Sequence, residues 1–167
     1  MLQGIVLGLH RVINPWDFPT FLAVTLAALT YALWRAGRLR HAAVVDDYAH
    51  MARAALLLFE ATGDWTYLDH AEAWVAIADN HYWDGDGGGY FLAADDTNDL
   101  ITRTKTIFDN AVPSGNGIMV EVLARLFYVR GDSAYRERAE KLLHAFNGQS
   151  PEYMANSPTF LNGYEFL

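Results

Sequence analysis

Hydrophobic residues recur at helical spacing along most of this chain, in segments separated by short polar turns. Between residues 46 and 61, the residues Met51, Ala55, Leu58 and Phe59 fall on one helical face, which is typical of a helix buried on one side. The same periodicity predicts further helices over residues 20–38, 66–81, 117–129 and 134–146, and another after Ser150 that Pro158 interrupts. We therefore expect an all-α fold.

The helical pattern occurs twice, at an offset of 68 residues. Matched residues flank both copies of a Gly-Asp turn: Gly63-Asp64 recurs as Gly131-Asp132, Met51 as Met119, Leu58-Phe59 as Leu126-Phe127, and Tyr67 as Tyr135. In each copy the glycine ends one helix and the aspartate caps the next. A fixed period with matched apolar positions indicates an array of helical hairpins that bury their apolar faces on one another.

Residues 82–112 interrupt this array. The glycine-rich run 84–89 cannot continue a helix, and residues 89–93 and 100–104 have the composition of two short strands joined by a polar turn at 95–99. We expect a small β-hairpin insert here.

Composition narrows the possible functions. The chain has 167 residues, a formal net charge of −8 and no cysteine, and we expect one domain over residues 1–167 with an irregular segment at 1–19. Without cysteine there can be no disulfide, thiolate metal site or cysteine nucleophile. The six histidines show no metal-ligand spacing, so we expect neither a metal nor a cofactor. No basic stripe is present, so we expect no nucleic-acid partner.

Phe18 to Trp34 carries no charge and is followed by arginines, which fits either a buried helix or a short membrane span. Thr20, Thr25 and Thr30 within the run favour the buried helix. We expect a cytoplasmic protein without a membrane partner.

The repeat predicts which residues meet at one end of the array. Asp46 in the first copy corresponds to Ser114 in the second, and Tyr48 corresponds to Asn116. Two hairpins in register place these helix starts at the same rim, where the insert also enters and leaves. A long polar insert on one rim of a compact array is more often functional than decorative.

The residues expected at this rim are candidates for a polar ligand site. The adjacent carboxylates Asp46 and Asp47, with His50 about one turn further on, are the candidates for acid–base catalysis. The candidates for substrate binding offer charge, hydrogen bonds or an aromatic face: Tyr48, Trp83, Arg103, Lys105, Asp109, Ser114 and Asn116.

Structural roles remain open for several of these residues. Either Asp46 or Asp47 is a candidate helix cap, and Ser114 is a candidate cap of the helix that follows it. Trp83 either covers the core or stacks on a ligand. Arg103 and Lys105 could instead pair with the aspartates of the turn at 95–99.

Six ordered runs extend this pattern: Asp46-Asp47-Tyr48-Ala49, Leu57 to Asp64, Tyr82-Trp83-Asp84, Gly87 to Phe91, Arg103-Thr104-Lys105 and Asp109 to Asn116. Together they resemble the helical region of the thioredoxin-domain-containing, spermatogenesis-associated protein family. That region is similar to the (α/α)6 toroid of N-acylglucosamine 2-epimerases and six-hairpin glycosidases. The resemblance implies a central pocket lined by Asp46, Asp47, Tyr48, Arg103, Lys105, Asp109, Ser114 and Asn116.

The chain departs from that family by lacking the cysteine-bearing thioredoxin-like domain and about half of the helices of a full toroid. The resemblance therefore implies a shortened relative with a partial toroid. A partial toroid leaves an apolar side open, so we expect a homo-oligomer that covers it.

Two functions follow from these features. The first is a carbohydrate-active pocket, epimerase- or isomerase-like or glycosidase-like, which binds a sugar or another small polar ligand at the N-termini of the inner helices. The alternative is a non-catalytic helical-hairpin module that binds another protein. A truncated toroid can lose activity and still fold, so the resemblance implies a pocket more firmly than turnover.

Overall fold

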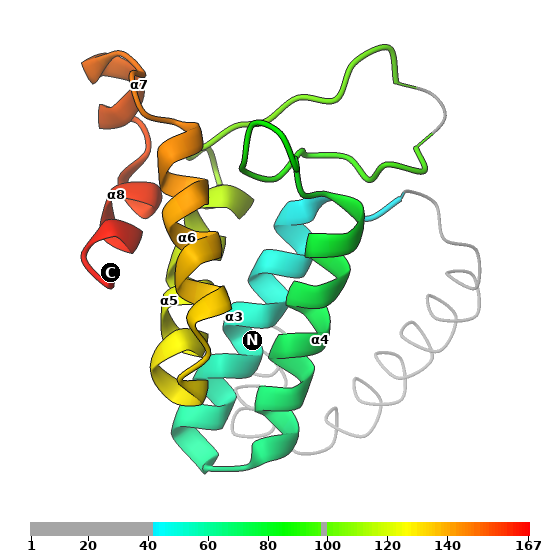
Figure 1. The fold of residues 1–167 in the computed structure, drawn as a ribbon, viewed down its shortest axis with the longest axis vertical. Helices are drawn as coiled ribbons and strands as arrows, with labels where there is room; N and C mark the ends of the chain where they lie inside the picture. The colour runs from blue at the N-terminus through cyan, green and yellow to red at the C-terminus, as the bar shows by residue number, and fades with distance from the viewer. Residues whose placement is uncertain (1–41, 98–99) are drawn as a thin grey trace, which may run out of the picture. The chain divides into compact units, whose positions relative to one another are not determined.

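Six helices make up the part of the chain that the structure, a computed structural model, describes, namely residues 42–97 and 100–167 (Figure 1). Their bounds are α3 (Val45–Thr62), α4 (Trp65–His81), α5 (Gly115–Arg130), α6 (Ser133–Ala145), α7 (Pro151–Ala155) and α8 (Pro158–Tyr164). The segment expected to be irregular at 1–19 and the helix expected at 20–38 lie outside the described residues. The described helices confirm the all-α fold class.

The two Gly-Asp turns have nearly the same geometry. Gly63 and Gly131 adopt φ angles of 70° and 72°, a left-handed conformation that glycine allows at little cost. The side chain of Asp64 accepts a hydrogen bond from the second residue of α4, and the side chain of Asp132 does the same for α6, both at 2.9 Å. The repeat seen in the sequence is therefore a structural repeat of two helical hairpins.

Helix α5 lies at the centre of the packing. It contacts α3 on one side, its own hairpin partner α6, and α8. All residues from Gly115 to Ala124 are buried, so this helix shows no polar face over its first ten residues. A helix that is buried all round must be surrounded by other elements, and α8 supplies part of that cover through Phe160.

The loop between α4 and α5 differs from the expected β-hairpin. No strand forms at 89–93 or at 100–104, and the β-structure of the described residues consists of one isolated antiparallel bridge between Trp83 and Tyr90. The chain turns back on itself at the glycine-rich run, where Asp84 Oδ1 accepts hydrogen bonds from two backbone N–H groups, at 3.1 Å each. The two segments that were expected to pair share one backbone–backbone hydrogen bond, from Leu92 N to Thr104 O.

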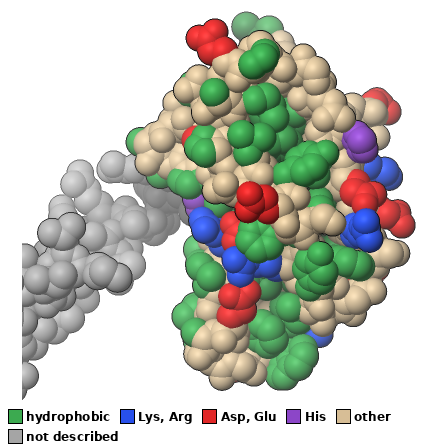
Figure 2. Space-filling model, turned by 90° about the vertical axis from the view of Figure 1, so that its left-hand side faces the viewer, with side chains coloured by type: hydrophobic (Ala, Val, Ile, Leu, Met, Phe, Trp, Pro, Cys, Tyr) green, Lys and Arg blue, Asp and Glu red, His purple; other side chains and the backbone are tan. Residues whose placement is uncertain are grey.

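Ion pairs also join the hairpins away from the loop. Glu121 on α5 is buried and pairs with Arg53 on α3 and with Arg125 one turn further along α5. Figure 2 shows acidic and basic side chains next to one another on the side of the molecule that carries α7 and α8, between patches of hydrophobic side chains. No helix within the described ranges combines the length and hydrophobicity that crossing a bilayer requires.

Candidate functional site

The starts of α3 and α5 meet at one end of the array, together with the loop that joins α4 to α5 (Figure 1). We call this the loop end. Asp46 Oδ1 accepts a hydrogen bond from the backbone N of Gly115 at 2.8 Å, which fixes the first turn of α3 against the first turn of α5. The structure therefore brings together the two helix starts that the repeat placed side by side.

The three proposed acid–base residues differ in their surroundings. Burial raises the pKa of Asp46, and the hydrogen bond from Gly115 opposes that rise. His50 Nε2 lies 3.2 Å from the carbonyl oxygen of Pro113, so this nitrogen carries the proton and donates. Asp47 is exposed and accepts a hydrogen bond from Val44 N at 3.0 Å. The N-cap of α3 is Val44, so neither aspartate is the N-cap that the sequence suggested. Both lie in the first turn of the helix, where Asp47, at the third position, accepts the hydrogen bond of a capping box.

Asn116 fastens the loop to the first turn of α5. Its side chain is buried, accepts a hydrogen bond from Tyr90 N at 2.8 Å and donates to Tyr90 O at 2.9 Å and to Thr106 O at 2.8 Å. These three bonds use the carbonyl oxygen and both amide hydrogens. Asn116 thus holds two segments of the loop by their backbones.

Ser114 and Asp109 make similar connections. Ser114 caps α5 by accepting a hydrogen bond from Gly117 N, and it donates to Ile107 O at 3.0 Å. The carboxylate of Asp109 accepts from Ser114 N at 2.8 Å and from Thr159 N, at the start of α8, at 2.7 Å. The cap expected at Ser114 is confirmed, and Asp109 joins the loop to both α5 and α8.

Lys105 holds the glycine-rich turn closed. Its ammonium group donates to Asp84 Oδ2 and to Gly88 O, at 2.7 Å each. The hydrogen bond from Lys105 is the main cause that lowers the pKa of Asp84, and backbone N–H groups of the turn add to it. Lys105 therefore pairs with Asp84 and, among the described residues, with neither Asp95 nor Asp96.

Arg103 and Tyr48 also make contacts inside the protein. The Arg103 guanidinium donates to Ala93 O at 2.9 Å and to His81 O at 2.8 Å, so it joins the loop to the end of α4. The Tyr48 ring packs against the ring of Tyr82, with centroids 5.4 Å apart. Burial is the main cause that raises the pKa of Tyr82 to about 12.

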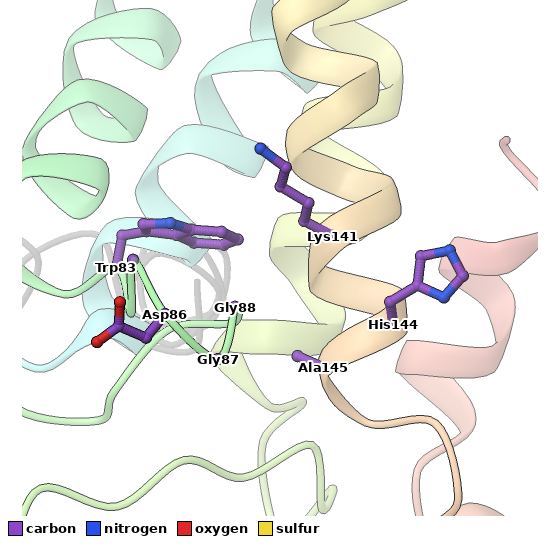
Figure 3. A pocket seen from close by; sticks show the side chains of 8 residues that line it. Trp83, Asp86, Gly87, Gly88, Lys141, His144 and Ala145 are labelled. Carbon is purple, nitrogen blue, oxygen red and sulfur yellow. The ribbon is translucent and has the colours of Figure 1, made fainter.

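A cleft opens at the loop end between the glycine-rich turn and the last turns of α6 (Figure 3). It has a volume of ≈ 330 Å³, and its side-chain walls are Trp83 and Asp86 on the loop and Lys141 and His144 on α6. Gly88, at a φ of 69°, brings the loop so close to α6 that a Cβ there would lie 3.0 Å from Lys141 O. In Figure 3 the Lys141 side chain lies on the side of α6 that faces Trp83, whereas the His144 ring points away from Trp83.

Packed groups hold Trp83 in the wall of this cleft. The guanidinium carbon of Arg138 lies 4.4 Å from the centroid of the Trp83 ring, and the ring of Tyr90 meets it edge-on at 5.0 Å. Tyr90 OH donates to Asp79 at 2.6 Å, and Arg138 pairs with the other oxygen of the same carboxylate at 3.6 Å. Burial raises the pKa of Asp79, while Tyr90 and Arg138 favour its charged form.

The structure thus divides the residues proposed from the sequence into one that lines the cleft and the others, which do not. Trp83 is the member that lines the cleft, and the cleft residues Asp86, Lys141 and His144 were not predicted. The antiparallel pairing of α5 and α6 was a signal for two of them, because it places the last turn of α6 at the end where α5 begins. Within the described ranges, no group of three or more histidine or acidic side chains could hold a metal ion.

The fold and the loop end define a class of protein: an array of helical hairpins whose helix starts are joined by a polar loop with a cleft beside it. Over 104 residues, 62% of its length, the chain is homologous to spermatogenesis-associated protein 20 of the rat, with 36% identity. The human protein of the same name is 33% identical over 104 residues. The match covers 13% of the length of each of these relatives. No protein-family model matches the chain.

Proposed function

We propose that this chain is a ligand-binding unit that takes a small polar molecule of the sugar class in the cleft beside Trp83. The observation that supports the proposal is the composition of the cleft: an aromatic residue, Trp83, an acidic residue, Asp86, and a basic residue, Lys141, line one hollow of ≈ 330 Å³. Within the described residues, neither Asp86 nor Lys141 forms an ion pair. Both side chains can therefore bind a ligand in the cleft.

A sugar ring matches these groups. Its C–H faces pack on an indole, and its hydroxyls bond to carboxylate and ammonium groups. The volume lies at the lower end of the roughly 300–1,000 Å³ of small-molecule pockets, so a single ring suits the cleft better than an oligosaccharide.

The contacts of the residues proposed for catalysis favour a structural role over a catalytic one. Asp46 and His50 lie at the same end of the array but do not line the cleft, and both make contacts to the start of α5 and the segment before it. Epimerase- or glycosidase-like turnover would require a substrate to reach Asp46, whose pKa is raised by burial. We therefore propose binding as the function of the cleft. The successive packing of α3, α5 and α8 supports a partial (α/α) toroid as the arrangement that carries it.

Isothermal titration of the full chain with glucose, mannose and N-acetylglucosamine tests this proposal. We expect at least one sugar to bind, and Trp83→Ala and Lys141→Met each to weaken that binding. Trp65→Ala is the matched control, because Trp65 also lies under an arginine, Arg130, but stands at the Gly-Asp end. Binding that survives both cleft substitutions, or the absence of binding for every sugar, would contradict the proposal.

A second candidate function is self-association through the face of α3. Met51 and Leu58 on this face are 51% and 44% exposed, whereas their counterparts on α5, Met119 and Leu126, are fully buried. The positions on α5 are covered by helices of this same chain, so we propose that a second copy covers those on α3.

Light scattering of the full chain tests the self-association. We expect a dimer or larger ring for the wild-type protein and a lower mass for the double variant Met51→Lys, Leu58→Lys. Tyr128→Lys, which changes an exposed residue of α5, is the control and should leave the mass unchanged. A wild-type monomer at micromolar concentration would contradict this candidate.

A further inference from the structure

The turn that follows α6 presents an Asn-Gly pair to solvent. Asn147 and Gly148 are both exposed, and Gly148 adopts a φ of 88°. The backbone N–H of Gly148 donates no hydrogen bond to another described residue. Glycine places no side chain over the preceding amide, so its nitrogen can approach the Asn147 side chain.

The chain contains two other Asn-Gly pairs, and the backbone of both is held in place. Asn116 makes three hydrogen bonds through its side chain, and Gly117 N donates to Ser114 Oγ. Gly163 is buried inside α8, where even a Cβ would come within 2.8 Å of Val120. In both pairs the backbone is held in helical geometry and cannot fold back on the asparagine.

The Asn147 side chain is held next to the cleft. Its amide nitrogen donates to Nδ1 of His144 at 2.8 Å, and His144 forms part of the cleft wall. A negative charge at residue 147 would therefore lie within reach of an imidazole of the cleft. It would also lie at the C-terminus of α6, where the helix dipole disfavours negative charge.

We propose that Asn147 is a site of spontaneous deamidation that changes the charge beside the cleft. Gly148 N forms a bond to Cγ of Asn147, the bond from Cγ to the side-chain nitrogen breaks, and the proton of Gly148 N–H leaves with that nitrogen as ammonia. Water then opens the cyclic imide at either carbonyl, which yields aspartate or isoaspartate. The net reaction consumes one water and releases one ammonia. This inference depends on the geometry of the turn and not on the ligand of the cleft.

Incubation of the folded full chain at mildly alkaline pH, followed by peptide mass spectrometry, tests the inference. Labelling with a protein isoaspartyl methyltransferase reports the isoaspartate product. A synthetic peptide covering residues 144–150 gives the rate without the fold, and circular dichroism checks that the protein stays folded. Asn147→Gln is the matched variant, because a glutamine at this exposed position leaves the turn intact but lengthens the side chain.

We expect Asn147 to be converted at a rate close to that of the peptide, while Asn116 and Asn162 stay unmodified in the same digest. The Asn147→Gln variant should lose the methyl label from the peptide that contains residue 147. Persistence of unmodified Asn147 after the peptide has been converted would overturn the inference. Conversion of Asn116 or Asn162 at the rate of Asn147 in the folded protein would overturn it as well.

Discussion

The carboxylate of Asp46 and the backbone N of Gly115 form a hydrogen bond of 2.8 Å that connects two helices of different hairpins. Asp46 belongs to the first turn of α3, and Gly115 begins α5. The bond satisfies one of the free N–H groups at the start of α5 with a side chain from the neighbouring hairpin. Asp46 thus contributes to the register between the two hairpins.

Substitution of Asp46 tests this contribution. Asp46→Ala leaves a partly buried N–H group without its acceptor, so we expect it to lower the free energy of unfolding by about 1–3 kcal/mol. Asp46→Asn keeps an oxygen acceptor and should recover most of the loss. Urea denaturation of both variants measures the difference, and equal loss in the two would show that the acceptor is not what matters.

Gly115 offers a steric test of the same contact. A Cβ at this residue would lie 3.0 Å from the Asp46 backbone, so Gly115→Ala should force α3 and α5 apart. We expect destabilisation of about 1–3 kcal/mol, as for other overpacked positions. The control is Gly85→Ala, where a Cβ meets nothing within 4 Å. Thermal unfolding compares the two, and a Gly115→Ala protein as stable as the control would mean that the helices adjust freely.

Removal of the Asn116 side chain should destabilise the loop end strongly. Asn116→Ala strands the N–H and C=O of Tyr90 and the C=O of Thr106 in a buried site, and we expect about 3 kcal/mol of lost stability or more. Asn110→Ala, at an exposed loop position, should cost far less. Hydrogen exchange followed by NMR should show the loss of protection first at Tyr90 N. An unchanged exchange rate there would exclude Asn116 as the anchor of the loop.

The pair of Lys105 and Asp84 predicts a dependence on pH. Because the hydrogen bond from Lys105 lowers the pKa of Asp84, the charged carboxylate stabilises the fold above its ordinary pKa of about 3.9. That stabilisation is lost as the pH falls through the lowered pKa of the folded state. Lys105→Met should therefore reduce stability at neutral pH, by about 1 kcal/mol or less for this partly exposed pair, and the difference in stability from the wild type should disappear in acid. Denaturation curves at several pH values check this. A difference in the free energy of unfolding that persists unchanged at low pH would show that the substitution acts through packing.

Local chemistry explains which parts of the fold the sequence predicts well. Gly63 and Gly131 each need a left-handed backbone, and Asp64 and Asp132 each cap the helix that follows, so short-range rules are enough to find both turns. The 68-residue offset then places the helix starts at the same end. The turns and the shared end can therefore be predicted from residues adjacent in the sequence and from the single 68-residue repeat.

The loop and the site depend on contacts between distant residues, which the sequence does not reveal. Residues 89–93 have the composition of a strand, but Asn116 and Lys105 bind the backbone of the loop by their side chains, and a ladder does not form. The polar residues at this end were recognised correctly as neighbours. Their partners could not be predicted, because a carboxylate or amide that binds a ligand and one that binds a backbone look alike in sequence.

The cleft proposal is tested most directly by NMR mapping of the full chain during titration with the sugar that binds best. The indole N–H of Trp83 and the backbone amides of Gly87 and Gly88 should shift together and saturate with one affinity, while the indole N–H of Trp65 stays in place. Shifts confined to Asp46 and His50, or spread evenly over the molecule without saturation, would contradict a binding site beside Trp83.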